Sequence, residues 1–442
     1  MSEACFKIME GAQKLQSGRE QLQELLKGGR LDKPLVFVDA ARHWPCMSWA
    51  TLLLQQQHEQ QQQQQQQFLQ APASLLWEEL GAIETTFRVH KRSSEGAVVW
   101  ESSCHYVKAS LTEFASWITS GSATATAMTA ETNLSRTTMA SEGRSEGAER
   151  VPTALGEFDP LTHWAYADYK YLSELFADHP QLLSAALFEE DFGFLSHPEN
   201  CAFWMGSQGA YTPCHQDCYG FNLVVQVAGK KRWTLFPPDQ GKHLYPTRIP
   251  YEESSVFSEV LVNDPDHKRF PLFRNAEKTE LILNPGDVLF VPHHWWHFVE
   301  TLEPSISLNQ WYELAKEDIR ERVSEALVRV IVSALKPAGA PAPSSPTAGH
   351  QQRSQWLNPT EEVWGLEENL GALRESLEAE GEVAGPSLDS LEEFTTFLVN
   401  SLACHSLPGV TDHLISDWKK MGRVRTREGD QDNPPKHFKQ SE

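Results

Sequence analysis

Residues 211–222 read Tyr-Thr-Pro-Cys-His-Gln-Asp-Cys-Tyr-Gly-Phe-Asn, and this stretch decides the fold predicted for the whole chain. Within it, Asp217 follows His215 by two positions. Side chains two apart on a strand point to the same face, so an imidazole and a carboxylate should enter one cavity together. They would supply two ligands of a metal site. A lone His-x-Asp pair is a weak indication, since either residue can also end a strand or form a surface ion pair.

The third ligand is predicted in residues 292–297, Pro-His-His-Trp-Trp-His, which follow a strand-like run at 287–291. By residue type alone, His293, His294 and His297 are rival candidates. Two imidazoles and one carboxylate on one face, with other metal positions open, are the ligands of non-haem Fe(II) oxygenases. Zinc could occupy the same ligands but could not activate O₂.

The region from residue 201 to about 312 is predicted to consist of short strands separated by Gly- and Pro-containing turns. This pattern indicates a mainly β fold, a sandwich or jelly roll. Upstream, we expect strands at 33–38, 85–89 and 101–107, and helices at 19–26, 111–118 and 172–188. Residues 52–69 would form an amphipathic helix except for their run of glutamine. An apolar stripe at helical spacing predicts another helix at 316–336, which either docks on the domain or forms a homodimer contact.

Two low-complexity segments interrupt this pattern. Residues 55–70 contain an unbroken run of glutamine from Gln60 to Gln67, and residues 119–157 are rich in Ser, Thr, Ala, Gly and Glu. Neither can bury enough apolar area to offset its ordering entropy, so we expect a surface expansion and a disordered insertion. The remaining parts are an N-terminal part at 1–54, a support region at 71–118, the core domain at 158–315, and a linker with a helical or disordered tail at 337–442.

Composition limits the classes of function. A formal charge of −22 over 442 residues argues against broad nucleic-acid binding, which needs clustered Lys and Arg. Seven cysteines without a C-x-x-C pair predict reduced thiols in an intracellular protein. No apolar stretch of about 18 residues occurs, so no membrane span is expected. The expected location is the cytoplasm, with the nucleus as the alternative.

Further blocks carry a resemblance to a known family. Thr212-Pro213 introduces the His-x-Asp pair, Asn222 follows it, and residues 229–233, Gly-Lys-Lys-Arg-Trp, turn into the next strand. Residues 235–238 (Leu-Phe-Pro-Pro), 284–287 (Asn-Pro-Gly-Asp) and 295–297 (Trp-Trp-His) continue the pattern. The chain resembles the JmjC family of Fe(II)/2-oxoglutarate dioxygenases, in its hydroxylase-like branch. The resemblance spans residues 30–360 apart from the two low-complexity segments.

The resemblance implies a double-stranded β-helix, a cupin-like jelly roll with flanking α-helices, that uses Fe(II) and the co-substrate 2-oxoglutarate. It assigns the metal to His215, Asp217 and His297, and leaves the other two histidines as rim or packing residues. It pairs the distal carboxylate of 2-oxoglutarate with Lys231, whose neighbours Lys230 and Arg232 should point to the opposite face. The other implied cofactor-binding residues are Thr212, Asn222, Asn309 and Tyr171, and Tyr166 or Tyr169 could replace Tyr171.

The predicted function is an oxygenase that hydroxylates a protein or RNA-associated substrate. The alternative is a JmjC scaffold that binds a partner without catalysis. Histone lysine demethylation is a further alternative, which the lack of a Cys/His zinc module makes less favoured. Residues 164–171, 245–257 and 356–360 are similar to JmjC proteins associated with a small heat shock protein. This similarity implies such a protein as a partner and a link to stress response.

Overall fold

The computed structural model describes residues 8–10, 32–54, 73–92, 96–120, 154–187, 197–314 and 317–335, with 368–369, 371–373 and 375–376. The predicted helix at 19–26, the Gln-rich segment and residues 121–153 lie outside this part. The ends of the predicted disordered insertion are structured, because residues 111–120 are helical and Leu155–Glu157 form a 3-10 helix with Leu155 buried. None of the described helices is long and apolar enough to cross a membrane.

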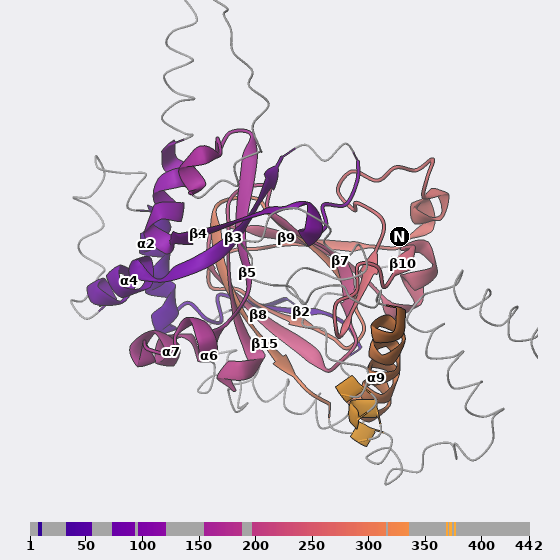
Figure 1. Ribbon diagram of the computed structural model, residues 1–442. Helices are drawn as coiled ribbons and strands as arrows, with labels where there is room; N and C mark the ends of the chain where they lie inside the picture. Colours follow the sequence, from indigo (N-terminus) through magenta and orange to yellow (C-terminus); the bar gives the residue numbers. More distant parts are fainter. Residues whose placement is uncertain are drawn as a thin grey trace, which may run out of the picture.

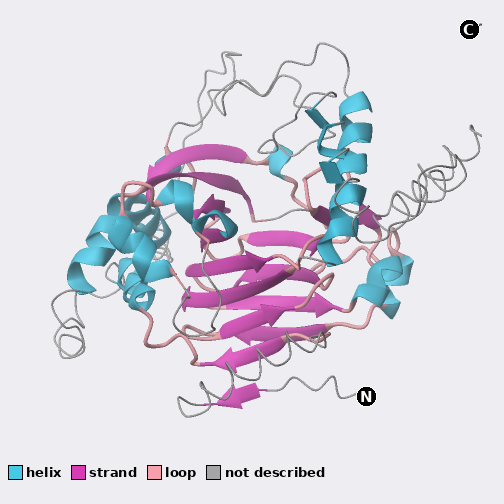
Figure 2. Cartoon of the chain, turned by 90° about the horizontal axis from the view of Figure 1, so that it is seen from below, coloured by secondary structure: helices cyan, strands magenta, loops and turns pink. Residues whose placement is uncertain are grey.

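Two sheets form the body of the domain (Figures 1 and 2). The nine-stranded sheet has the order β1 (Ile8–Glu10), β2 (Leu35–Val38), β13 (Val288–Val291), β8 (Phe221–Ala228), β15 (Ser305–Tyr312), β6 (Cys201–Gly206), β5 (His163–Tyr171), β3 (Glu84–Lys91) and β4 (His105–Ser110). The six-stranded sheet has the order β10 (Pro246–Thr247), β11 (Ser255–Ser258), β7 (Tyr211–Asp217), β14 (Trp296–Thr301), β9 (Lys231–Phe236) and β12 (Thr279–Leu283). The predicted mainly β, cupin-like jelly roll is confirmed.

Helices cover the outer face of the nine-stranded sheet at one end, as Figure 1 shows for α2 (Ala50–Leu54), α4 (Ala73–Ala82), α6 (Leu172–Leu175) and α7 (Pro180–Ala186). Their apolar side chains share a core with outward-facing strand residues such as Phe203 and Phe87. The single helix predicted at 172–188 is two short helices, because Pro180 lacks an N–H and begins a new helix. The predicted strand at 101–107 begins only at His105, after a 3-10 helix at Glu101–Ser103.

Apolar side chains such as Leu235 and Leu289 fill part of the space between the sheets. The cavity beside them is lined mainly by polar and aromatic side chains from both sheets, and it shares Val224, Trp233 and Val299 with this apolar cluster. The described cysteines are buried and form no disulfide with one another: Cys46, Cys104, Cys201, Cys214 and Cys218.

Helix α9 (Glu317–Leu335) lies against the six-stranded side of the domain, away from the other helices (Figure 1). Its docking depends on a buried ion pair, in which Arg248 Nη2 lies 2.6 Å from Glu325 Oε2 and the two side chains are 1% and 0% exposed. The backbone N–H of Ser254 also donates to Glu325 Oε2, at 3.0 Å. Val323 and Leu327 are buried beside this pair. The described part of this face therefore docks on the domain, which is the first of the two predicted alternatives, and a homodimer contact stays a prediction.

Replacing Arg248 by alanine should lower the free energy of unfolding by about 3–5 kcal/mol, because the Glu325 carboxylate would stay buried without its partner. Urea denaturation followed by circular dichroism measures this change. The control is Lys230→Ala, which removes an ion pair with Glu303 whose side chains are 43% and 51% exposed and should cost less than about 1 kcal/mol. Equal losses for the two variants would contradict the role given to the buried pair.

Candidate metal and co-substrate site

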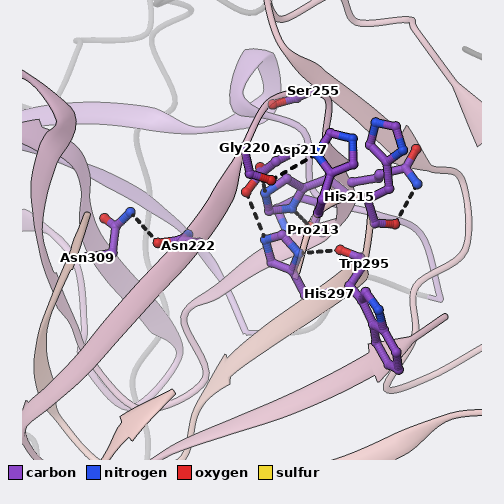
Figure 3. Close-up of polar contacts among 12 residues, drawn as sticks. Pro213, His215, Asp217, Gly220, Asn222, Ser255, Trp295, His297 and Asn309 are labelled. Atoms are coloured by element: carbon purple, nitrogen blue, oxygen red, sulfur yellow. Dashed lines mark hydrogen bonds and ion pairs between the residues drawn. The ribbon is translucent and has the colours of Figure 1, made fainter. Parts of the chain in front are cut away.

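The two metal-site histidines are cross-strand neighbours. β14 pairs antiparallel with β7, and in this register His297 lies directly opposite His215. Opposite residues in an antiparallel pair share a face of the sheet, and the two imidazole centroids are 4.1 Å apart. Asp217 follows two positions after His215 on the same strand and turns to the same side, as Figure 3 shows. The structure thus brings together the three predicted ligands.

Backbone carbonyls orient both imidazoles. His215 Nδ1 lies 2.9 Å from the carbonyl oxygen of Pro213, and His297 Nδ1 lies 3.0 Å from that of Trp295 (Figure 3). A carbonyl can only accept, so each Nδ1 carries the proton and each Nε2 is left to bind a metal. The Nε2 atoms lie 3.4 Å (His215) and 4.0 Å (His297) from the two carboxylate oxygens of Asp217. All three ligand atoms are within 4.8 Å of one another, close enough to share one ion.

The three ligand side chains shift one another's pKa values. Burial and repulsion from His215 lower the pKa of His297 to about 4. Burial alone would lower the pKa of His215, but hydrogen bonding to Asp217 and the charge of that carboxylate raise it overall. Burial alone would raise the pKa of Asp217, but the neighbouring His297 and His215 lower it. A divalent ion bound at the two Nε2 atoms would compete with protons for these imidazoles, because metal ligands must be deprotonated.

Lys231 supplies a buried cation in the same cavity. Its side chain is on the cavity face of β9 and is 2% exposed, whereas Lys230 is half-exposed beside Glu303, as the predicted strand register requires. Lys231 Nζ donates to Ser307 Oγ at 2.7 Å and to the Tyr166 hydroxyl at 3.2 Å. Both of these partners are neutral, and burial lowers the pKa of Lys231 to about 7. A buried ammonium with such partners is suited to receive an anionic ligand.

Thr212 reaches this pocket through a β-bulge. It lies three positions before His215, so regular alternation would turn it to the opposite face. The pairing register shifts between His297 and Val299, and Thr212 is the partner of Val299. The extra residue on β7 returns Thr212 to the cavity face, where its hydroxyl lies 3.3 Å from that of Tyr166.

The opposite wall of the cavity comes from the nine-stranded sheet. Asn309 Nδ2 donates to Asn222 Oδ1 at 3.0 Å (Figure 3), and the Trp204 indole donates to Asn309 Oδ1 at 2.6 Å. Ser307 and Trp311 lie two positions to either side of Asn309 on β15 and also line the cavity. The Trp311 side chain hydrogen-bonds to Asp217. The predictions omitted these two residues, although their spacing from Asn309 on a strand could have indicated them.

Tyr171 is not placed in this cavity. It lies at the end of β5, is 40% exposed, and its ring lies 6.3 Å from that of Trp311. Tyr166 and Tyr169, the alternatives on the same strand, line the cavity. Tyr166 fits because it packs on Gly206, where any Cβ would lie 2.9 Å from the tyrosine ring. The tyrosine hydroxyl that contacts Lys231 in this cavity is therefore that of Tyr166, and Tyr171 is not among the residues that line the cavity.

The residues fit the two groups that the resemblance implies. The cavity has about 400 Å³ of empty space, including its open mouth, with the ligand triad and Lys231 on its wall. The 2-oxo acid end of a five-carbon dicarboxylate could contact the metal. Its distal carboxylate could contact Lys231, Tyr166 and Thr212. The remaining metal positions would stay open, as this ligand set allows.

The fold and site define a class of protein, and the chain belongs to the cupin-like domain family, whose model matches residues 30–318. Among named relatives, HSPB1-associated protein 1 of Bos taurus is 40% identical over 333 residues, which are 75% of this chain and 56% of that protein. The Homo sapiens protein of the same name is 39% identical over 344 residues, 77% of this chain and 58% of that protein. The chain thus spans somewhat more than half the length of these relatives.

A shorter match supports the JmjC assignment. JmjC domain-containing protein D of Dictyostelium discoideum is 42% identical over 108 residues, 24% of this chain and 23% of that protein. The JmjC resemblance inferred from the sequence motifs is therefore confirmed.

Replacing Lys231 by alanine should weaken 2-oxoglutarate binding about 30-fold or more, because losing one member of a buried charge pair costs about 2–5 kcal/mol. Lys230→Ala, on the opposite face of the same strand, should have no effect. Titration of the Mn(II)-loaded proteins with 2-oxoglutarate measures both. Weaker binding in Lys230→Ala alone would show that the strand register is wrong by one residue.

The affinity for 2-oxoglutarate should also depend on pH. Below pH 7 Lys231 is charged and ready to pair, whereas above pH 7 binding must take up a proton. The dissociation constant should therefore rise with pH above about 7, by at most about tenfold per unit, in Mn(II)-loaded protein. Isothermal titration calorimetry in buffers of different ionisation enthalpy detects the proton uptake. A constant affinity from pH 6.5 to 8.5 would contradict the assignment of Lys231.

Proposed function

We propose that this chain is an Fe(II)- and 2-oxoglutarate-dependent JmjC oxygenase that hydroxylates a protein or an RNA-associated substrate. The observation that carries the proposal is the pairing, in one cavity, of a His-Asp-His ligand set with a buried lysine that donates hydrogen bonds to two neutral hydroxyls. A structural zinc site would use the ligands, but it would not require the buried ammonium. When bound, iron supplies the redox chemistry that couples decarboxylation of 2-oxoglutarate to oxygen insertion into a C–H bond.

The chain's own residues would perform three tasks. His215, Asp217 and His297 hold the metal on one side only, so that co-substrate and O₂ have positions to occupy. Lys231 and its hydroxyl partners fix the distal end of the co-substrate and thereby its orientation. Trp204 and Trp311, half-buried near the rim, restrict access of water and leave an approach for a substrate side chain.

A second function is favoured by the relatives' names. Proteins named HSPB1-associated protein 1 are associated with HSPB1 by that name, and we propose a small heat shock protein as a partner of this chain too. A scaffold with a secondary metal site is the alternative to the oxygenase. Lysine demethylation is a weaker alternative, because the match that supports it is short. Lysine-specific demethylase 8 of Danio rerio is 40% identical over 112 residues, which are 25% of this chain and 26% of that protein. For location we propose the cytoplasm.

Anaerobically iron-loaded protein, mixed with 2-oxoglutarate and O₂, should form succinate slowly even without a substrate, and Asp217→Ala should reduce this to the background rate. Mass spectrometry of succinate measures turnover. The matched control is Glu303→Gln, which changes a half-exposed surface carboxylate and should keep the wild-type rate. The scaffold alternative would be favoured if the wild type formed no succinate and the Asp217→Ala variant still bound a small heat shock protein tightly.

A further inference from the structure

A second cluster of metal-binding side chains lies outside the cavity. The loop between β13 and β14 carries His293 and His294, and the first turns of α9 carry Glu321. One ligand atom from each of the three lies within 4.8 Å of the others. We propose that these residues form a second metal site, which takes a divalent cation of the zinc class and is independent of the proposed oxygenase activity.

The backbone brings two adjacent imidazoles to one side. Neighbouring side chains normally diverge, but His294 has φ +62°, a conformation uncommon for a residue other than glycine. The two rings are consequently stacked, with centroids 3.6 Å apart and planes inclined by 28°. The carbonyl oxygen of His294 accepts a hydrogen bond of 2.6 Å from Gln216 Nε2, which holds the loop in this conformation. Thus the chain adopts an unusual backbone that gathers two ligands.

The orientation of His293 follows the same rule as that of the two cavity histidines. Its Nδ1 lies 2.9 Å from the carbonyl oxygen of Gly220, so a proton at Nδ1 leaves the lone pair on Nε2. His294 Nε2 lies 3.8 Å from Glu321 Oε1, too far for a hydrogen bond, and 3.3 Å from the carbonyl oxygen of Cys218. To bind a metal through Nε2, His294 must give up the contact with that carbonyl and carry its proton on Nδ1. Two ligands of one tetrahedral zinc ion, each about 2.1 Å from the metal, are separated by roughly 3.4 Å, so a small side-chain adjustment would close the site.

The surroundings suit a cation. His293 Nδ1 is also 3.9 Å from Asp318 Oδ1, which adds a second carboxylate from α9. The His293, His294 and Glu321 side chains are 26%, 28% and 20% exposed, so a metal can enter from solvent and keep a water ligand. Two protonated imidazoles stacked this closely would repel each other, whereas one divalent ion satisfies both rings. Two imidazoles, one carboxylate and a water are a common ligand set for zinc.

A metal here would join three segments. His293 contacts the carbonyl of Gly220, and His294 Nε2 lies 3.3 Å from that of Cys218, both just after the ligand Asp217. His294 precedes the ligand His297 by three positions, and Glu321 belongs to α9. The second site would thus fasten the helix to both ligand-bearing segments without contributing to the cavity.

The test uses the full chain with Asp217→Ala, so that the cavity site is disabled. The zinc content is measured by elemental mass spectrometry after equilibrium dialysis against micromolar Zn²⁺. Compared with Asp217→Ala alone, adding Glu321→Gln should remove one zinc ion per chain, and adding His293→Asn should do the same. Glu303→Gln is the matched control and should leave the zinc content unchanged. Zinc should also raise the melting temperature of the Asp217→Ala chain but not of the chain that carries Glu321→Gln as well.

Two results would overturn the second site. One is an unchanged zinc content in both Glu321→Gln and His293→Asn, in protein shown by circular dichroism to be folded. The other is loss of 2-oxoglutarate-dependent iron binding in Glu321→Gln with Asp217 intact, because the cluster would then serve the cavity site only. Retention of iron and 2-oxoglutarate binding by Glu321→Gln is the expected result, and it separates this proposal from the proposed oxygenase function.

Discussion

The pairing of β7 with β14 is the interaction on which the rest of the site depends. It places His215 directly opposite His297, and the alternation of β7 then adds Asp217 to the same face. A slip of one residue would turn His297 away from the cavity, because side chains alternate between the two faces of a sheet. The backbone carbonyls that fix the two Nδ1 protons belong to residues two positions earlier in the same segments, so register and tautomer are set together.

The strand on the other side of β14 uses the same register to position the co-substrate pocket. Lys231 on β9 pairs with Thr301, four positions beyond His297 and therefore on the same face. The metal ligands contribute a carboxylate to the cavity, and Lys231 contributes an amino group whose hydrogen-bond partners are the neutral hydroxyls of Tyr166 and Ser307. A divalent metal and a dicarboxylate would complete both halves of the cavity.

Sequence periodicity could predict the parts of this site that follow regular strands. His215 with Asp217, and Lys231 against Lys230, obey strict alternation, and residue spacing alone places them correctly. Thr212 does not, because a bulge on β7 changes its face, and bulges leave no mark in composition. Its place was implied by the family resemblance and not by the pattern.

The tyrosine assignment fails for a related reason. A second bulge on β5, where Tyr169 has φ +51°, shifts the register between Ala167 and Lys170. Tyr166 and Tyr171 both end on the cavity side of the sheet, but only Tyr166 is deep enough to reach Lys231. How far inside the cavity a strand residue lies depends on where the opposite sheet ends. The local sequence does not encode that position. The docking of α9 is similar, since the sequence showed an apolar stripe but not that Glu325 would meet Arg248.

The central claim is that one cavity holds a metal and 2-oxoglutarate together, and crystallography of the protein grown with Mn(II) and 2-oxoglutarate without O₂ tests it most directly. The account predicts anomalous density for manganese bonded to Nε2 of His215, Nε2 of His297 and the carboxylate of Asp217. It also predicts density for the dicarboxylate between that ion and Lys231 Nζ. Manganese found only at His293 and Glu321, or a dicarboxylate bound away from Lys231, would contradict the account.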